Sequence, residues 1–119
     1  MGSTKTLAYL MDVLSAIRLI EEFSAGKTVN EFKADAMFRS AVERQLSILG
    51  EAIVKLLKSD PALENLIDSA RQIVGFRNQL IHNYGGIDPD VVWTVVVQEL
   101  PALKQCSDDL IRRLGGQVA

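Results

Sequence analysis

Apolar residues recur at three- and four-residue steps along most of the chain, which is the spacing of one face of an α-helix. Between these stretches lie glycine, proline and short polar runs, which are typical of turns and helix ends. The pattern therefore predicts a succession of helices joined by short connections. The long predicted helices cover residues 4–23, 34–58, 69–83 and 89–114, and short helical turns are predicted at residues 30–32 and 61–67.

Local features make this prediction more specific. Asn30 is the expected cap of the first short turn, and Met37 is assigned to the buried stripe of the second long helix. Residues 91–97 have the β-branched and aromatic side chains of a strand, but a single strand would have no partner here, so we expect helix. Pro101 should kink this last helix, because proline has no N–H to donate. Trp93 is assigned to the core rather than to a base-stacking surface.

These elements predict an all-α fold, an up-and-down bundle of four to five helices in which residues 1–119 form a single domain. The composition, 48% hydrophobic and 24% charged, is typical of a folded protein. No apolar run reaches the ~20 residues of a membrane-spanning helix, and no hydrophobic leader follows Met1. We therefore expect a cytoplasmic protein without a membrane segment. Because a small bundle has much surface for its volume, we also expect dimerisation.

The composition argues against several kinds of site. The net charge of −2 does not favour nonspecific coating of a polyanion, although it allows a local nucleic-acid site. With His82 as the only histidine and Cys106 as the only cysteine, the chain can form neither a multi-histidine zinc site nor an internal disulfide. Glycine-rich phosphate loops and serine-nucleophile motifs are absent from the sequence. We therefore expect no bound metal and no cofactor.

One segment differs in charge from the rest of the chain. Residues 70–87 contain no Asp or Glu, although acidic residues outnumber basic ones overall. The segment combines cationic, imidazole, amide and phenol groups, which suit the recognition of an RNA phosphate. These groups belong to Arg71, Arg77, Asn78, His82, Asn83 and Tyr84.

Helical geometry distributes these groups over more than one face. Asn78 and His82 are four residues apart and share a face, whereas Arg77 lies about 140° around an ideal helix from His82. A second copy of the helix, crossing near Gly75, could bring both groups to one cleft. A simpler interpretation also stands, in which His82 only favours the helix dipole, Arg77 is solvated and Tyr84 is a packing residue.

The motif RNQLIH at residues 77–82 matches the pattern of the HEPN superfamily, which is an arginine, a polar residue, three further residues and a histidine. Its continuation to Tyr84 resembles the Arg-x4-His-x-Tyr form of the HepT-like toxins. The resemblance covers residues 7–104, and three further segments carry it: FKAD at 32–35, ILGEA at 48–52 and VVW at 91–93.

This resemblance implies a metal-independent ribonuclease toxin that acts as a homodimer and is opposed by a MNT-type nucleotidyltransferase antitoxin. It implies that Arg77 and His82 are catalytic in a composite cleft at the dimer interface, with Asn78 as the polar neighbour that binds RNA. It also implies that the antitoxin adenylylates Tyr84. The chemistry suits RNA, because the 2′-hydroxyl is the nucleophile, an imidazole can transfer protons at neutral pH and a guanidinium can bind phosphate.

Two other functions remain open. The chain could be a non-catalytic helical partner that binds substrate or nucleotide for a separate nucleotidyltransferase, or it could be a purely structural dimer. The presence of both Arg77 and His82 favours the ribonuclease, because a binding partner would not need the pair. Glu51 is expected to face solvent, and the alternative is that it orients an arginine of the cleft.

Overall fold

The computed structural model describes residues 4–65, 67, 69–82 and 86–115. Over these residues the structure is helical and contains no strand, so the predicted all-α fold class is confirmed. The long helices lie close to their predicted positions. They are α1 (Thr4–Ser24), α3 (Ala36–Ser59), α4 (Ala70–His82) and α6 (Leu100–Arg113), and the short elements are α2 (Val29–Ala34), the 3-10 turn η1 (Pro61–Asn65), α5 (Pro89–Thr94) and the π-helical turn η2 (Val95–Glu99).

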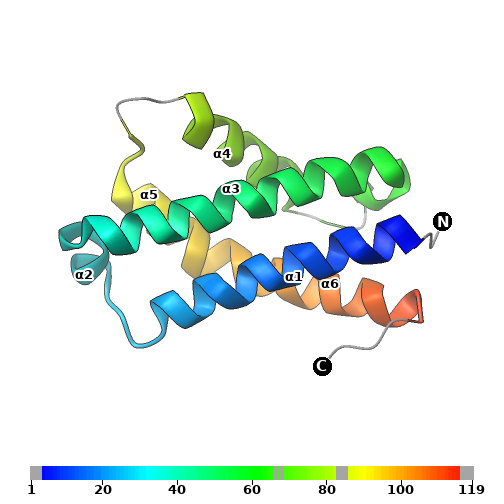
Figure 1. Cartoon of the computed structure of the whole chain (residues 1–119), viewed down its shortest axis with the longest axis horizontal. Coiled ribbons are helices and arrows are strands. Elements are labelled where there is room, and N and C mark those ends of the chain that lie inside the picture. The colour runs from blue at the N-terminus through cyan, green and yellow to red at the C-terminus, as the bar shows by residue number, and fades with distance from the viewer. Residues whose placement is uncertain (1–3, 66, 68, 83–85, 116–119) are drawn as a thin grey trace.

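The long helices alternate in direction along the bundle (Figure 1). Helix α1 packs along α3 over most of its length, α4 packs on α3, and α6 packs on α1. The bundle measures 43 × 29 × 19 Å. Within the described part of the chain, none of the helices combines the length and apolar character needed to cross a bilayer.

The core fills the space between these helices with aliphatic side chains and the phenylalanines Phe32 and Phe76. Each such side chain contributes roughly 1.5–3 kcal/mol when it is fully removed from water. The largest fully buried side chains are those of Leu10, Leu14, Ile17, Ile20, Phe32, Leu46, Leu49, Ile53, Leu56, Ile73, Leu100 and Leu103.

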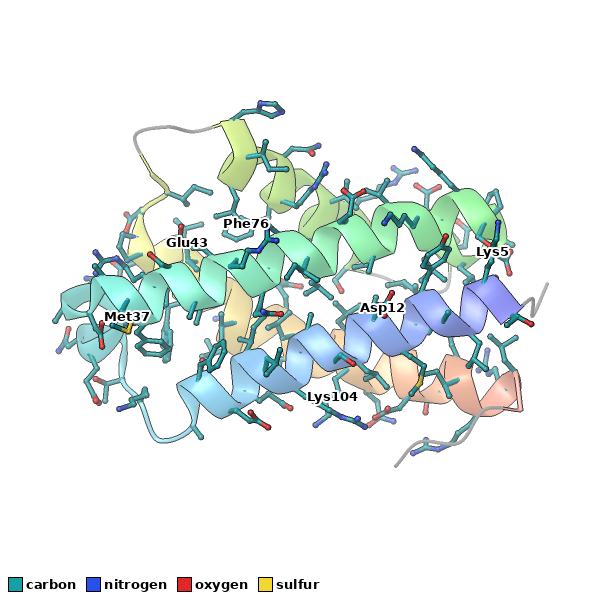
Figure 2. All side chains as sticks on the ribbon, in the orientation of Figure 1. Lys5, Asp12, Met37, Glu43, Phe76 and Lys104 are labelled. Atoms are coloured by element: carbon teal, nitrogen blue, oxygen red, sulfur yellow. The ribbon has the colours of Figure 1, made fainter. Side chains whose placement is uncertain are left out.

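Met37 is the exception to the predicted core, because 82% of its surface is exposed. It lies in the first turn of α3, at the end of the bundle (Figure 2). Its neighbour Phe38 packs instead against Phe32, with ring centroids 5.1 Å apart, and against Trp93 at 6.0 Å. Trp93 therefore packs at the core, as predicted, and this aromatic cluster joins α2, α3 and α5.

A charged pair joins α2 to α5 beside the aromatic cluster. Lys33 Nζ lies 2.9 Å from Asp90 Oδ2, and both side chains are well exposed. The hydrogen bond to Asp90, followed by the charge of this carboxylate, raises the pKa of Lys33 above its ordinary value. Lys33 therefore stays positively charged at neutral pH.

The first short helix begins earlier than we predicted. Thr28, not Asn30, caps α2, and Asn30 lies inside the helix. The Glu31 backbone N–H donates to Thr28 Oγ1 at 3.2 Å, and the Thr28 N–H donates to Glu31 Oε1 at 3.1 Å. This reciprocal capping box satisfies two backbone donors at once, which a cap at Asn30 would not do. Asp35 then caps α3 by accepting hydrogen bonds from the first turn of that helix.

The valine-rich start of the last helix is helical, as predicted, and Pro101 does not end the helix. The chain passes from α5 through η2 into α6, and the Leu100 N–H donates to the Val95 carbonyl in the five-residue pattern of a π-helix. Proline cannot donate to a preceding carbonyl, and its ring crowds the carbonyl four residues before it, which here belongs to Val97. The wider π-helical turn directly before Pro101 accommodates this crowding.

Candidate functional site

Helix α4 lies unusually close to α3 where Gly50 meets Arg77. Gly50 is buried, and a Cβ atom built on it would lie 2.4 Å from the Arg77 Cβ and 2.6 Å from its Cγ. Carbon atoms cannot approach to that distance, so only glycine fits at this position. The stem of Arg77 therefore lies directly on the backbone of α3.

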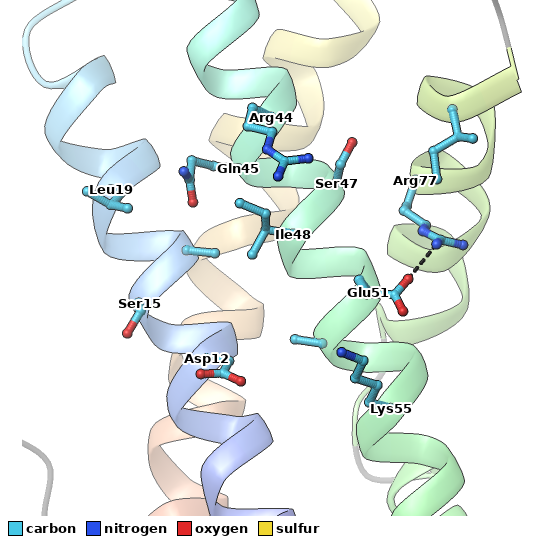
Figure 3. A pocket seen from close by; sticks show the side chains of 13 residues that line it. Asp12, Ser15, Leu19, Arg44, Gln45, Ser47, Ile48, Glu51, Lys55 and Arg77 are labelled. Carbon is cyan, nitrogen blue, oxygen red and sulfur yellow. Dashed lines mark hydrogen bonds and ion pairs between the residues drawn. The ribbon is translucent and has the colours of Figure 1, made fainter.

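The guanidinium of Arg77 is held from two sides. It forms an ion pair with Glu51, the residue after Gly50 (Figure 3). Its NH1 group also donates to Asn78 Oδ1 at 3.0 Å. The Arg77 side chain is 24% exposed, and its Nε is buried without an acceptor among the described residues. Glu51 thus contacts the arginine, which is the alternative that the sequence left open, and its expected role as a purely solvated residue is wrong.

Arg77 lies at the edge of a groove between α1 and α3, with a volume of about 480 Å³. Its walls are mixed, with apolar side chains such as Leu19 and Ile48 beside charged ones (Figure 3). The charged side chains that line the groove are those of Asp12, Arg44, Glu51, Lys55 and Arg77. Neither Arg44 nor Lys55 forms an ion pair within the described residues, so both cations are available to an anionic ligand.

His82 and Arg77 are not brought together within one chain. His82 is the last residue of α4 and is exposed, and Asn78, one turn earlier, is exposed as well. Among the described residues, the hydrogen-bond partners of Arg77 are Glu51 and Asn78, so none of its bonds reaches His82. Tyr84, the fourth residue of the predicted site, lies outside the described residues.

The exposed face of α4 includes a glycine that the chain itself does not require. A Cβ atom on Gly75 would meet nothing within 4 Å. Among the described residues, the glycines with a positive φ are Gly26, Gly86 and Gly115, so Gly75 has an ordinary helical backbone. A glycine in mid-helix costs roughly 1 kcal/mol relative to alanine. Packing among the described residues of a single chain therefore gives no reason for a glycine at this position.

Some residues of the groove were not predicted. Arg44 and Lys55 lie eleven positions apart on the face of α3 that also carries Glu51, but the sequence alone does not show which faces of α3 remain uncovered. In the sequence, Gly50 is distinguished only by its place in the ILGEA segment at residues 48–52. As for metals, the described residues contain no group of three His, Cys, Asp or Glu side chains placed to hold an ion.

The fold and this site define an all-α bundle that carries an arginine and a histidine on one helix, with the arginine held in a groove. The family described as Ribonuclease HepT-like matches residues 13–110. The chain therefore belongs to the HepT-like ribonuclease family of the HEPN superfamily, as the sequence motif predicted, and its enzyme class is ribonuclease.

Similar proteins occur in several other organisms. A "Probable ribonuclease HepT" of Thermococcus cleftensis is 38% identical over 81% of this chain and 86% of its own length. A "Putative RNase" of Methanocaldococcus jannaschii is 34% identical over 88% of this chain and 95% of its own. Another "Putative RNase", of Caldanaerobacter subterraneus, is 27% identical over 88% of this chain and 93% of its own length. No solved structure matches this chain.

Proposed function

We propose that this protein is a metal-independent endoribonuclease, the toxin of a toxin–antitoxin pair, with Arg77 and His82 as its catalytic residues. The observation that carries the proposal is the placement of the motif on α4. Arg77 is fixed by Glu51 and Asn78 at the edge of a groove, and His82 is exposed at the helix end. Membership of the HepT-like ribonuclease family supports the choice of RNA as substrate.

The proposed reaction needs no metal-activated water, because RNA supplies its own nucleophile. The 2′-oxygen attacks the adjacent phosphorus while the bond from phosphorus to the 5′-oxygen breaks. The products are a 2′,3′-cyclic phosphate and a free 5′-hydroxyl. One His82 imidazole accepts the proton of the 2′-hydroxyl, a second donates a proton to the leaving 5′-oxygen, and Arg77 stabilises the charge that grows on the phosphate oxygens. Asn78 contributes a polar contact to the RNA.

A homodimer supplies what one chain lacks in this mechanism. Arg77 packs toward α3 while His82 lies at the exposed end of α4, so a second copy is needed to place an arginine and two histidines around one phosphate. Gly75 supports this arrangement, because its open side would allow two α4 helices to cross closely about a two-fold axis. We therefore infer that α4 forms the centre of the dimer interface.

Control of the activity is proposed to act on Tyr84, two residues after His82. A MNT-type nucleotidyltransferase, the antitoxin of the pair, would transfer AMP to the phenol. The added phosphate and adenosine would block RNA by charge and by size. Because the substrate would be cellular RNA, we place the reaction in the cytoplasm.

The test is RNA cleavage by the purified protein in buffer with EDTA. Wild-type protein should cleave single-stranded RNA and leave 2′,3′-cyclic phosphate ends. His82→Ala and Arg77→Ala should each lower the rate by at least about 100-fold, the scale of lost acid–base or electrostatic catalysis, while circular dichroism shows an unchanged helical fold. Cleavage that stops with EDTA, or full activity in either variant, would refute the mechanism.

A further inference from the structure

Three lysines surround a recess at the end of the bundle where α1 begins and α3 ends. The recess has a volume of about 310 Å³ and is lined by Lys5, Tyr9, Lys55, Lys58 and Ser59. No acidic side chain lines it. In a protein with a net charge of −2, this is a local concentration of positive charge around a concave surface.

The three lysines are not neutralised within the chain. Among the described residues, Lys5, Lys55 and Lys58 have neither an ion-pair nor a hydrogen-bond partner. Lysines elsewhere on the surface behave differently. Lys27 pairs with Glu31 at 3.8 Å, and Lys104 pairs with Glu21 at 3.0 Å. The positive charge of the recess is therefore available to an anionic ligand, whereas the charges of Lys27 and Lys104 are balanced by their glutamate partners.

The walls of the recess are fixed relative to one another. Thr6 of α1 is buried, and its Oγ1 lies 3.3 Å from Ser59 Oγ of α3. This hydrogen bond joins the residue after Lys5 to the residue after Lys58, so it sets the spacing of the two lysines. Tyr9, one turn further along α1, packs partly against the core and leaves part of its ring at the recess. An aromatic ring among cations is the usual surface for an unpaired base.

Helix stability explains only part of this charge. Lys58 lies in the last turn of α3, where a cation interacts favourably with the helix dipole. Lys5 lies in the first turn of α1, where a cation is unfavourable, and that turn contains no acidic residue to offset it. The position of Lys5 therefore costs stability, which points to a role in binding an anion.

Lys55 connects the recess to the groove at Arg77. It lines the recess together with Lys58, and it lines the groove together with Arg77 and Glu51. Glu51, Lys55 and Lys58 follow one another along α3, as Figure 3 shows for the first two, and about 10 Å of helix separates Glu51 from Lys58. Because the carboxylate of Glu51 is already paired with Arg77, Lys55 is the cation that links the groove to the lysines at the end of the bundle.

We propose that this surface, defined by Lys5, Lys55, Lys58 and Tyr9, binds the strand of single-stranded RNA that flanks the cleaved phosphate. The lysines would bind successive backbone phosphates, and Tyr9 would stack with a base. The identity of the ligand rests on the proposed ribonuclease function, whereas the position of the site rests on the recess itself. Such contacts add affinity that does not depend on sequence.

The experiment measures binding of a fluorescein-labelled 20-nucleotide RNA by fluorescence anisotropy over a series of NaCl concentrations. The RNA is 2′-O-methylated, so it lacks the nucleophile, and the result does not depend on whether the chain cleaves RNA. The double variant Lys5→Ala/Lys58→Ala should raise Kd about tenfold, and it should reduce the slope of log K against log salt by about 1.4, since each phosphate contact with a single strand contributes about 0.7.

The matched control is Lys27→Ala/Lys104→Ala, which removes the same charge from lysines that are already paired. This control variant should leave both the Kd for RNA and the slope of log K against log salt nearly unchanged. An equal loss in the two double variants, or no loss with Lys5→Ala/Lys58→Ala, would overturn the proposal. The proposal would also be overturned if Lys5→Ala/Lys58→Ala lost binding to phosphatidylserine vesicles but kept its binding to RNA, because that result would assign the recess to a lipid surface. Thermal melting of each variant verifies that its fold is intact.

Discussion

Gly50 and Arg77 are in direct contact, with the side-chain stem of the arginine lying where a Cβ atom of residue 50 would be. The contact joins α3 to α4 at the point where Glu51 and Asn78 hold the guanidinium. The position of the proposed catalytic arginine thus depends on the absence of a single methyl group from the neighbouring helix. Packing of the bundle and geometry of the site are therefore coupled here.

Gly50→Ala should both destabilise the protein and impair cleavage. The added methyl group must push α4 away from α3, and such overpacking typically costs about 1–3 kcal/mol in the free energy of unfolding. The same movement displaces Arg77 from the groove. Urea unfolding followed by circular dichroism measures the first effect, and the RNA cleavage rate measures the second. Wild-type stability in Gly50→Ala would show that the two helices are not in close contact.

Gly75→Ala is the matched control on the exposed face of α4. Nothing within 4 Å opposes the new methyl group, so the isolated fold should gain up to roughly 1 kcal/mol from better helix propensity. Cleavage should nevertheless fall, because the proposed crossing of two α4 helices is obstructed. Light scattering at low concentration should find more monomer than for wild type. A fully active, dimeric Gly75→Ala protein would move the interface away from this glycine.

Glu51 should act as a positioning residue for Arg77. Glu51→Gln keeps a hydrogen-bond acceptor and should lower the cleavage rate about tenfold, whereas Glu51→Ala should lower it about 100-fold, as expected when a binding group is misplaced. The control is Glu64→Gln, which breaks a 2.5 Å pair with Arg71 at the start of α4, and neither of these residues lines the groove. Partly exposed pairs contribute little to stability, so all three variants should unfold at similar urea concentrations. Equal rates for Glu51→Gln and Glu64→Gln would remove Glu51 from the site.

The helices and the motif could be predicted because both are local properties of the sequence. The periodic apolar stripe marks α1, α3 and α4 without knowledge of their neighbours. The contact of Arg77 with Glu51 could not be predicted in the same way, since these residues are 26 positions apart and meet only through the way α3 and α4 pack. Gly50 has no distinguishing feature until that packing is known.

The local errors also have physical causes. Met37 has the spacing of a core residue, but the first turn of α3 extends past the helices that would cover it. Asn30 is a good capping residue, yet Thr28 followed by Glu31 forms a capping box and begins the helix earlier. A pattern of residue types shows where a helix can form, whereas its cap and its covered length depend on competing contacts.

Glu43 should make stability depend on pH. This half-buried carboxyl group of α3 (Figure 2) has a pKa raised by burial, which the charge of Arg39 partly opposes. The folded state therefore holds the proton more tightly than the unfolded state, so stability falls as the pH rises from the ordinary value of 4.5 through the raised pKa. Glu43→Gln should be slightly more stable than wild type at pH 7, by an amount that solvent screening keeps small for this partly exposed group, and the difference should vanish below pH 4.5.

Urea unfolding at pH 4 and pH 7 measures this difference, with Glu22→Gln on the exposed surface of α1 as the control substitution. A stability gain of Glu43→Gln that is the same at both pH values would show that ionisation of Glu43 is not its cause.

Tyr84 should accept AMP from the partner nucleotidyltransferase. Incubation with this enzyme, ATP and magnesium should increase the mass of the chain by one or more AMP groups and stop RNA cleavage. Tyr84→Phe should stay unmodified and should cleave RNA at close to the wild-type rate, because the phenol has no proton-transfer role in the proposed reaction. Intact mass spectrometry follows the modification. Tyr9 is the only other tyrosine of the chain, so Tyr9→Phe is the control and should still be modified.

The composite site can be tested by mixing chains, since a site built from two copies fails when either copy is defective. Wild-type chains are refolded together with an equal amount of the double variant Arg77→Ala/His82→Ala. Random pairing makes about one quarter of the dimers fully wild type, and one half of them mixed. If each site draws its arginine and histidines from both chains, mixed dimers are inactive, and activity per total chain falls to about one quarter. Independent sites within each chain would instead leave one half, so a value near one half would rule out the shared cleft.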